Sequence, residues 1–122
     1  MRNINNISRH DCIKIMQWCK TNLGCKANKV MPALRFEGKQ KYEGWHGLYD
    51  WDDNTIIVRL DGHVDCIDLC DTIIHEWSHY LQPVRNFMSR DKKHGYRKNP
   101  YEKEAARRAK VWRDICYNEI FK

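Results

Sequence analysis

The fold of this chain is decided by residues 67–81, which read IDLCDTIIHEWSHYL. Apolar residues recur in this stretch at alternating spacings of three and four, which is the pattern of an amphipathic helix with one buried face. The members of this apolar stripe are Ile67, Cys70, Ile74, Trp77 and Leu81. Pro83 predicts the end of the helix, because proline lacks the backbone N–H that a continuing helix needs. The motif HEWSH at residues 75–79 therefore lies inside a helix.

The residues before this helix predict a first helix and a first strand. Ser8 and Asp11 have the spacing of a capping box, and apolar residues then follow at helical spacing, which predicts a helix over residues 8–23. Residues 30–36 alternate loosely between apolar and polar side chains and predict a short strand. Pro32 favours an edge position or an irregular start for this strand, because proline cannot donate a hydrogen bond within a sheet.

Two further strands and a last helix complete the predicted domain. Residues 45–51 and 55–60 flank a polar turn and predict a hairpin. Pro100 predicts the start of a final helix, in which apolar residues again recur at helical spacing. The order helix, small sheet, helix, helix predicts an α+β domain with a three-stranded sheet. No linker or repeat divides the sequence, so we expect residues 1–122 to form a single domain.

Length and composition indicate a globular protein with no membrane span. The chain has 122 residues, of which 42% are hydrophobic and 31% charged, and this is enough for one hydrophobic core. It contains no apolar run of the roughly 20 residues that a membrane helix requires. Residues 1–9 lack the apolar segment of a secretory signal, so we expect a cytoplasmic protein. In the reducing cytosol its six cysteines are expected to be free thiols.

The HEWSH motif has the chemistry of a metal site. His75 and His79 are four residues apart, so their imidazoles project from one face of the helix and can bind one metal ion. Zinc bound by two histidines, a carboxylate and a water molecule is typical of a catalytic site, because the metal lowers the pKa of that water toward about 7. Glu76 lies beside the histidines and can act as the general base that takes up the proton. The motif therefore predicts a zinc-dependent hydrolase.

A third protein ligand is expected in residues 99–106, which read NPYEKEAA. Glu102 and Glu104 lie on the first turns of the final helix, at opposite edges of its apolar stripe. Helical periodicity does not choose between them, and the helix dipole favours acidic residues of either kind near an N-terminus. Both remain candidate ligands on the sequence pattern alone.

Other polar side chains near the motif have weaker signals. Asp71 lies one turn before His75 and either orients that ring by accepting its second N–H or is a solvated surface acid. His46 and His63 are expected on the surface, because their positions favour ordinary exposure over a ligand role. None of the three is predicted to bind the metal directly.

The order of these motifs resembles that of the compact gluzincin metallopeptidases, which include the minigluzincins, the SprT-like proteases and the repressor-cleaving metallopeptidases of phage and bacterial stress circuits. The resemblance covers residues 45–110 and rests on the matching stretches Gly47 to Tyr49, Thr55 to Leu60, His75 to His79 and Glu102 to Ala105. It implies a zinc peptidase whose third ligand is the Glu directly before Ala, which is Glu104 here and is favoured over Glu102 on this ground. It also implies that a substrate strand adds to a sheet edge beside the active-site helix, here in the hairpin at 45–60.

A hydrogen-bond donor is expected to stabilise the negative charge that develops on the substrate carbonyl oxygen. His94 and Tyr96 are the candidates for this catalytic role, since they lie in the loop between the two helices that carry the ligands. Either is also compatible with an ordinary surface position, and His94 is a weaker candidate as a metal ligand.

The charge of the chain raises a second class of function. The net charge is +6, and half of the 22 basic residues fall between residues 85 and 113. A basic field attracts polyanions, so one alternative is a nucleic-acid-associated module whose zinc is structural, although a solvated helix face explains the same charges. Another alternative is a latent relative that keeps zinc for stability.

We favour the peptidase, because a structural zinc site usually has four protein ligands and needs no base such as Glu76. This peptidase would bind one zinc ion through His75, His79 and Glu104. Its substrate would be a peptide or protein.

Overall fold

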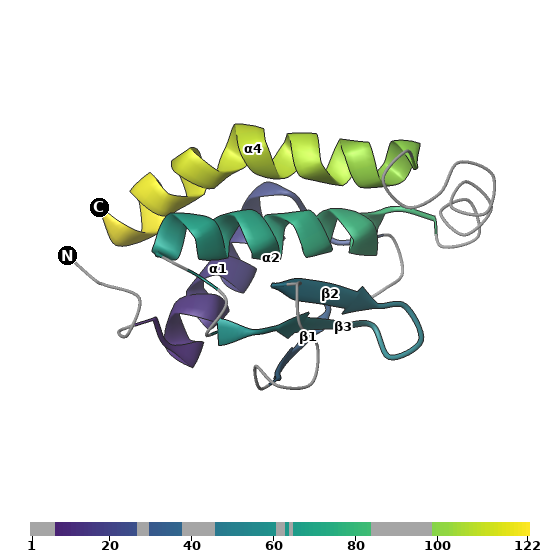
Figure 1. Ribbon diagram of the computed structural model, residues 1–122, viewed down its shortest axis with the longest axis horizontal. Helices are drawn as coiled ribbons and strands as arrows, with labels where there is room; N and C mark the ends of the chain where they lie inside the picture. Colours follow the sequence, from purple (N-terminus) through teal and green to yellow (C-terminus); the bar gives the residue numbers. More distant parts are fainter. Residues whose placement is uncertain (1–6, 27–29, 38–45, 61–62, 64, 84–98) are drawn as a thin grey trace.

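The computed structural model describes residues 7–26, 30–37, 46–60, 63, 65–83 and 99–122. Within these residues the chain forms three helices and one three-stranded mixed sheet, the α+β arrangement that the sequence predicts (Figure 1). In chain order the elements are α1 (Arg9–Asn22), β1 (Ala33–Phe36), β2 (Gly47–Asp50), β3 (Thr55–Val58), α2 (Cys66–Leu81) and α4 (Pro100–Phe121). Each predicted helix and strand is present, and the strands are shorter than predicted. None of the helices in this part of the chain is both long and apolar enough to cross a bilayer.

The sheet has the predicted hairpin at one side and the proline-containing strand at the other. Its strand order is β1-β3-β2, with β1 parallel to β3 and β2 antiparallel to it. β1 is therefore an edge strand of this sheet, as Pro32 indicated. The hairpin turn uses Asn54 at a φ of 49°, a left-handed conformation that asparagine tolerates better than most residues. Its position is held by the Tyr49 hydroxyl, which donates to Asn54 Oδ1 at 2.6 Å.

Local capping signals explain where the first two helices begin. Ser8 Oγ accepts a hydrogen bond from the N–H of Asp11 at 3.2 Å, and the Asp11 carboxylate accepts one from the N–H of Ser8 at 3.0 Å. These two bonds satisfy donors that a helix start otherwise leaves unpaired, so the predicted capping box is confirmed. At the start of α2, Asp65 plays the same part by accepting from the N–H of Asp68 at 2.8 Å.

α2 is the centre of the domain and contacts α1, α4, β2 and β3. The middle of its predicted apolar stripe is fully buried, at Cys70, Ile74 and Trp77. Trp77 also donates from its indole Nε1 to the carbonyl oxygen of Gly24 at 2.9 Å, just after the end of α1. These contacts fix the rotation of α2 about its axis. Figure 1 shows α4 running alongside α2 in the opposite direction, so that the first turns of α4 lie beside the last turns of α2.

All six cysteines are free thiols, as expected, and five of them are buried. The five buried thiols are Cys12, Cys19, Cys66, Cys70 and Cys116. They lie in α1, α2 and α4, where they pack as small apolar side chains in the helical part of the core. Burial raises the pKa of the Cys12 thiol to about 12, which keeps this thiol protonated and unreactive at neutral pH.

Candidate metal centre

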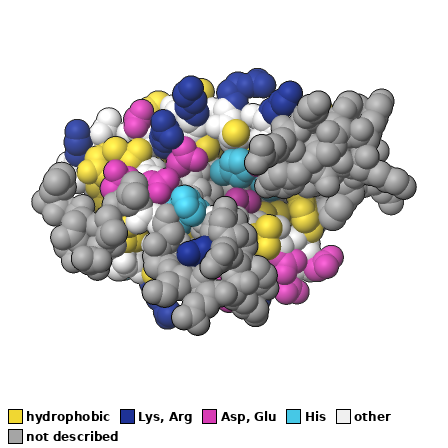
Figure 2. All heavy atoms as spheres, viewed as in Figure 1, with side chains coloured by type: hydrophobic (Ala, Val, Ile, Leu, Met, Phe, Trp, Pro, Cys, Tyr) yellow, Lys and Arg dark blue, Asp and Glu magenta, His cyan; other side chains and the backbone are white. Residues whose placement is uncertain are grey.

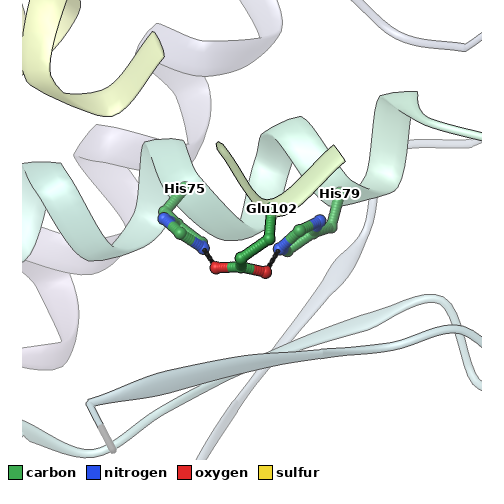
Figure 3. A group of neighbouring side chains, drawn as sticks. All are labelled: His75, His79 and Glu102. Atoms are coloured by element: carbon green, nitrogen blue, oxygen red, sulfur yellow. Dashed lines mark ion pairs between the residues drawn. The ribbon is translucent and has the colours of Figure 1, made fainter. Parts of the chain in front are cut away.

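Two histidines of α2 and one glutamate of α4 meet at the junction of these helices. Figure 3 shows the carboxylate of Glu102 between the imidazoles of His75 and His79. Glu102 Oε1 lies 2.5 Å from His75 Nε2, and Glu102 Oε2 lies 2.8 Å from His79 Nε2. One ligand atom from each of the three side chains lies within 4.8 Å of the other two, which is close enough for a shared metal ion.

The start of α4 explains why Glu102 reaches the histidines. Asn99 is fully buried, and its Oδ1 accepts from the N–H of Tyr101 at 2.9 Å, which fixes the first turn of the helix. Pro100 occupies the start of α4, where its missing N–H costs no helical hydrogen bond. Glu102 follows within the same turn and faces α2. The cap and the proline thus set the position of the carboxylate in the site.

Glu104, the third ligand favoured by the resemblance, is not at the site. Its side chain is exposed, accepts from Gln82 Nε2 at 3.2 Å and lies 3.7 Å from Arg108 Nη2. Two residues along an α-helix correspond to a rotation of about 200°, so only one of Glu102 and Glu104 can face α2. The structure brings Glu102, and not Glu104, to the two histidines.

The carboxylate of Glu102 is strongly held in its charged form. Burial raises its pKa, but the hydrogen bonds and charges of His75 and His79 outweigh burial and hold this pKa at about 2. The pKa of His75 shifts in the opposite direction. Burial lowers the pKa of His75, and the contact with Glu102 together with nearby carboxylate charge raises it above its ordinary value. Glu102 thus favours the protonated form of His75, and His75 favours the ionised form of Glu102.

Glu76 lies in the same pocket but points from α2 toward β2. It is 8% exposed, and its carboxylate accepts a hydrogen bond from the backbone N–H of Tyr49. Burial raises the pKa of Glu76, against the lowering effect of His75 and His79. Glu76 is therefore a buried carboxylate with increased proton affinity, oriented by a strand backbone and separate from the group that contains Glu102.

The pocket at this site has a volume of about 240 Å³ and lies between the start of β2 and the two helices. Its lining residues are His46, Gly47, Asp71, Thr72, His75, Glu76 and Glu102. Figure 2 shows histidine and acidic side chains gathered on this face of the molecule, below a row of Lys and Arg side chains along α4. The pocket is thus open to solvent at one side and is lined by the predicted base and by two of the three candidate ligands, His75 and Glu102.

Gly47 allows β2 to approach α2 closely enough to form this pocket. A Cβ atom at this position would lie 2.5 Å from Thr72 Cγ2 and 3.4 Å from Glu76 Cγ. Thr72 cannot rotate freely, because its Oγ1 is hydrogen-bonded to His63 Nε2 at 2.7 Å. We expect Gly47→Ala to lower the free energy of unfolding by about 1–3 kcal/mol, the usual cost of overpacking.

Urea unfolding of Gly47→Ala would measure this cost. Leu48→Ala is the matched control in the same strand, since Leu48 is 48% exposed and its truncation should change stability by only about 0.5 kcal/mol. A Gly47→Ala protein as stable as the wild type would show that β2 can move away from α2 without loss, and would contradict the close approach.

His46 and His63 differ in their outcomes. His46 is exposed, as expected, and lines the pocket. The prediction that His63 lies on the surface is wrong, because its side chain is 2% exposed. Its Nδ1 lies 2.8 Å from the carbonyl oxygen of Arg59 and its Nε2 lies 2.7 Å from Thr72 Oγ1. His63 therefore links the end of the hairpin to α2 behind the pocket.

Asp71 has a partner other than His75. Its Oδ2 accepts from Arg113 Nη1 of α4 at 2.7 Å. Since the pair is partly exposed, it connects α2 to α4 at the side of the pocket with a modest contribution to stability. The sequence left open an acid that orients the imidazole and a solvated surface acid, and neither describes this contact, in which Asp71 links α2 to α4 through Arg113.

Gln82, at the C-cap of α2, is a site residue that the sequence did not single out. It is 3% exposed. Its Oε1 lies 2.8 Å from His79 Nδ1, and its Nε2 donates to the carbonyl oxygen of Tyr101 at 2.8 Å. The one available signal was its place three residues after His79 and directly before Pro83, where a buried polar residue has carbonyl groups of the helix end within reach.

His94 and Tyr96, the candidate donors for the oxyanion, lie outside the described residues, as does the segment 84–98 of the basic region. Their roles stay predictions. The rest of the basic region forms part of α4 and includes Arg108 and Arg113, which pair with Glu104 and Asp71.

Comparison with protein families shows which family this chain belongs to. The model of the family described as "Protein of unknown function (DUF3920)" matches residues 5–117. The chain belongs to the DUF3920 family. Comparison with curated proteins and with solved structures found no match. All site residues named above in this DUF3920 protein lie inside the matched region.

The donor set of the DUF3920 protein fits zinc. Two imidazole nitrogens and one carboxylate oxygen are the protein ligands of many catalytic zinc sites, in which a fourth position stays open. His79 Nδ1 faces the amide oxygen of Gln82 at 2.8 Å, which leaves Nε2 toward Glu102 Oε2 at 2.8 Å. This is the distance of a charged hydrogen bond, and a metal ion would take the place of that contact between the same two atoms. The three side chains therefore present the donor atoms that a zinc ion needs.

Proposed function

We propose that this DUF3920 protein is a zinc-dependent metallopeptidase, with His75, His79 and Glu102 as the zinc ligands and Glu76 as the general base. The observation that carries the proposal is the position of Glu76. It is a buried carboxylate with a raised pKa, lines the same pocket as His75 and Glu102, and is not one of the three proposed ligands. A structural zinc site needs no such group, whereas a hydrolytic site needs a base beside the metal.

Each residue has a separate part in the chemistry. Zinc would supply a Lewis acid and a water molecule of lowered pKa. The Tyr49 N–H holds the Glu76 carboxylate at the wall of the pocket, so that a proton taken up by its oxygen can be delivered to a leaving amine nitrogen. The low pKa of Glu102 keeps this carboxylate ionised at neutral pH, as a ligand must be.

The outer edge of β2 supports a peptide as the substrate class. The N–H of Arg59 donates to the carbonyl oxygen of His46 at 3.0 Å, so bonded pairs recur at every second residue of the hairpin. Leu48 therefore bonds toward β3, while the backbone of Gly47 and Tyr49 faces away from the sheet, as the bond from Tyr49 to Glu76 also requires. None of the described strands pairs with this side of β2, so an extended peptide could pair with its remaining backbone groups beside the pocket, in agreement with the resemblance to gluzincins.

The alternatives of a nucleic-acid-associated module with structural zinc and of a latent peptidase predict different results in one experiment. Zinc content would be measured by elemental analysis, together with cleavage of unfolded casein before and after removal of the metal by a chelator. We expect about one zinc per chain, cleavage by the zinc-loaded protein, loss of cleavage on chelation and recovery on zinc addition. Zinc binding without cleavage would favour the structural or latent alternatives, and a protein that binds no zinc would overturn the proposal.

A further inference from the structure

We propose that Gln82 is a positioning residue that fixes the direction of the His79 ring and favours the tautomer with its proton on Nδ1, so that Nε2 of this histidine faces the position of the metal. The inference rests on the proposed zinc site and adds a residue that neither the motif nor the resemblance includes. It follows from the hydrogen bonds of one buried side chain.

The orientation of the Gln82 amide is decided by Tyr101. A backbone carbonyl oxygen can only accept a hydrogen bond, so the group of Gln82 that lies 2.8 Å from the Tyr101 carbonyl oxygen must be the NH₂. Glu104 Oε1, a carboxylate oxygen and also an acceptor, lies 3.2 Å from the same nitrogen. The amide oxygen of Gln82 must then face His79 Nδ1, at 2.8 Å.

The tautomer of His79 follows from this orientation. An amide oxygen cannot donate, so the hydrogen bond to Gln82 requires the proton to be on His79 Nδ1. A neutral imidazole has only one N–H, and Glu102 Oε2, also an acceptor, lies 2.8 Å from Nε2, so in the metal-free protein the two acceptors compete for this proton. A metal ion bound by Glu102 would remove this competition, and a proton held on Nδ1 by Gln82 leaves the lone pair at Nε2, the atom that belongs to the group of candidate ligands. Gln82 thus favours the tautomer that can bind a metal through Nε2.

Gln82 is held by hydrogen bonds of its backbone as well as by those of its side chain. Its backbone N–H donates to the carbonyl oxygen of His79 at 3.1 Å, and its carbonyl oxygen accepts from Lys26 Nζ at 3.1 Å. With the side-chain bonds, this one residue joins the end of α2 to the start of α4 and to the segment after α1. The same contacts connect His79 to Tyr101, the neighbour of Glu102, so the relative placement of the two ligands depends on Gln82.

Two variants separate orientation of the imidazole from simple packing. Gln82→Met keeps the length of the side chain and removes the acceptor. Gln82→Glu keeps an acceptor for His79 Nδ1 and removes the NH₂ donor. Zinc affinity would be measured by competition with a chelating dye, and the tautomer of His79 by ¹⁵N NMR of the zinc-free protein with the ring neutral. Circular dichroism would establish that both variants are folded.

We expect a smaller fraction of Nδ1–H in Gln82→Met than in the wild type, and a zinc affinity lower by about 10–100-fold in this variant. Gln82→Glu should restore the wild-type fraction of Nδ1–H and most of the affinity. A folded Gln82→Met protein with the tautomer fraction and the zinc affinity of the wild type would overturn the inference. If Gln82→Met moves the proton away from Nδ1 but neither protein binds zinc, the inference stands and the proposed function fails.

Discussion

A Glu76→Gln variant should keep its zinc and lose about 10²–10⁴-fold of its peptidase activity, the usual contribution of a general base. Glutamine has almost the same shape and can still accept the hydrogen bond from the Tyr49 N–H, so the pocket should not collapse. The amide cannot take up a proton, however, and the reaction would lose its base. Since burial raises the pKa of Glu76, the charged form is unfavourable in the fold, and removal of the charge should not lower stability.

The measurement is the rate of casein cleavage at saturating zinc, with the zinc content of each protein determined in parallel. Glu119→Gln is the matched control, because Glu119 lies near the far end of α4 beside Trp18 and is remote from the pocket. It should cleave like the wild type. Equal rates for Glu76→Gln and the wild type would remove Glu76 from the mechanism, and with it the observation that distinguishes a catalytic from a structural site.

The second large effect is expected at the third ligand. Glu102→Gln should weaken zinc binding by more than about 100-fold, beyond the range found for residues that only support a ligand. A neutral amide is a poor zinc ligand and provides no charge between the imidazoles, where the carboxylate has a pKa of about 2. The matched change Glu104→Gln, two residues away, should reduce affinity only a few-fold, because it removes a charge that is exposed and keeps an oxygen for Gln82 Nε2.

Chelator competition on the two variants gives a direct ranking of the two acids. If Glu104→Gln lost the metal and Glu102→Gln kept it, the residue implied by the resemblance to gluzincins would be correct, and the meeting of Glu102 with the histidines would not represent the zinc-bound protein. If neither change affected binding, both acids would be outside the coordination sphere.

Much of the fold could be predicted because its signals are local. The apolar stripe of α2, the capping box at Ser8 and the proline at the start of α4 each act within one or two turns of helix. The two histidines and Glu76 could be predicted for the same reason, since their relation depends only on the geometry of a single helix.

The choice between Glu102 and Glu104 is not a local property. Both acids flank the apolar stripe of α4, and the rotation that selects Glu102 is set by packing of buried Ala105 and Ala109 against the rest of the core. The sequence places this stripe on one side of the helix but does not show which of its two edges lies next to α2.

The roles of His63 and Gln82 were also hidden, because burial of a polar side chain depends on partners distant in the sequence. His63 is buried by virtue of Arg59 and Thr72, and Gln82 through Tyr101, 19 residues further along the chain. Each partner is brought within reach only by the packing of α2 against the hairpin or against α4. Helical periodicity shows only which residues share one face of a helix, so it does not predict contacts between residues that are distant in the sequence.

The five buried thiols allow local unfolding of the native protein to be measured by chemical labelling. A thiol reacts with an alkylating agent only as an accessible thiolate, and these thiols are inaccessible while the core is closed. Exposed Cys25 should be modified first, and its labelling rate provides the reference for an accessible thiol in the same sample. The remaining labels would then appear at the rates at which α1, α2 and α4 transiently unfold, and mass spectrometry of the labelled peptides would rank the three helices by local stability without any engineered probe.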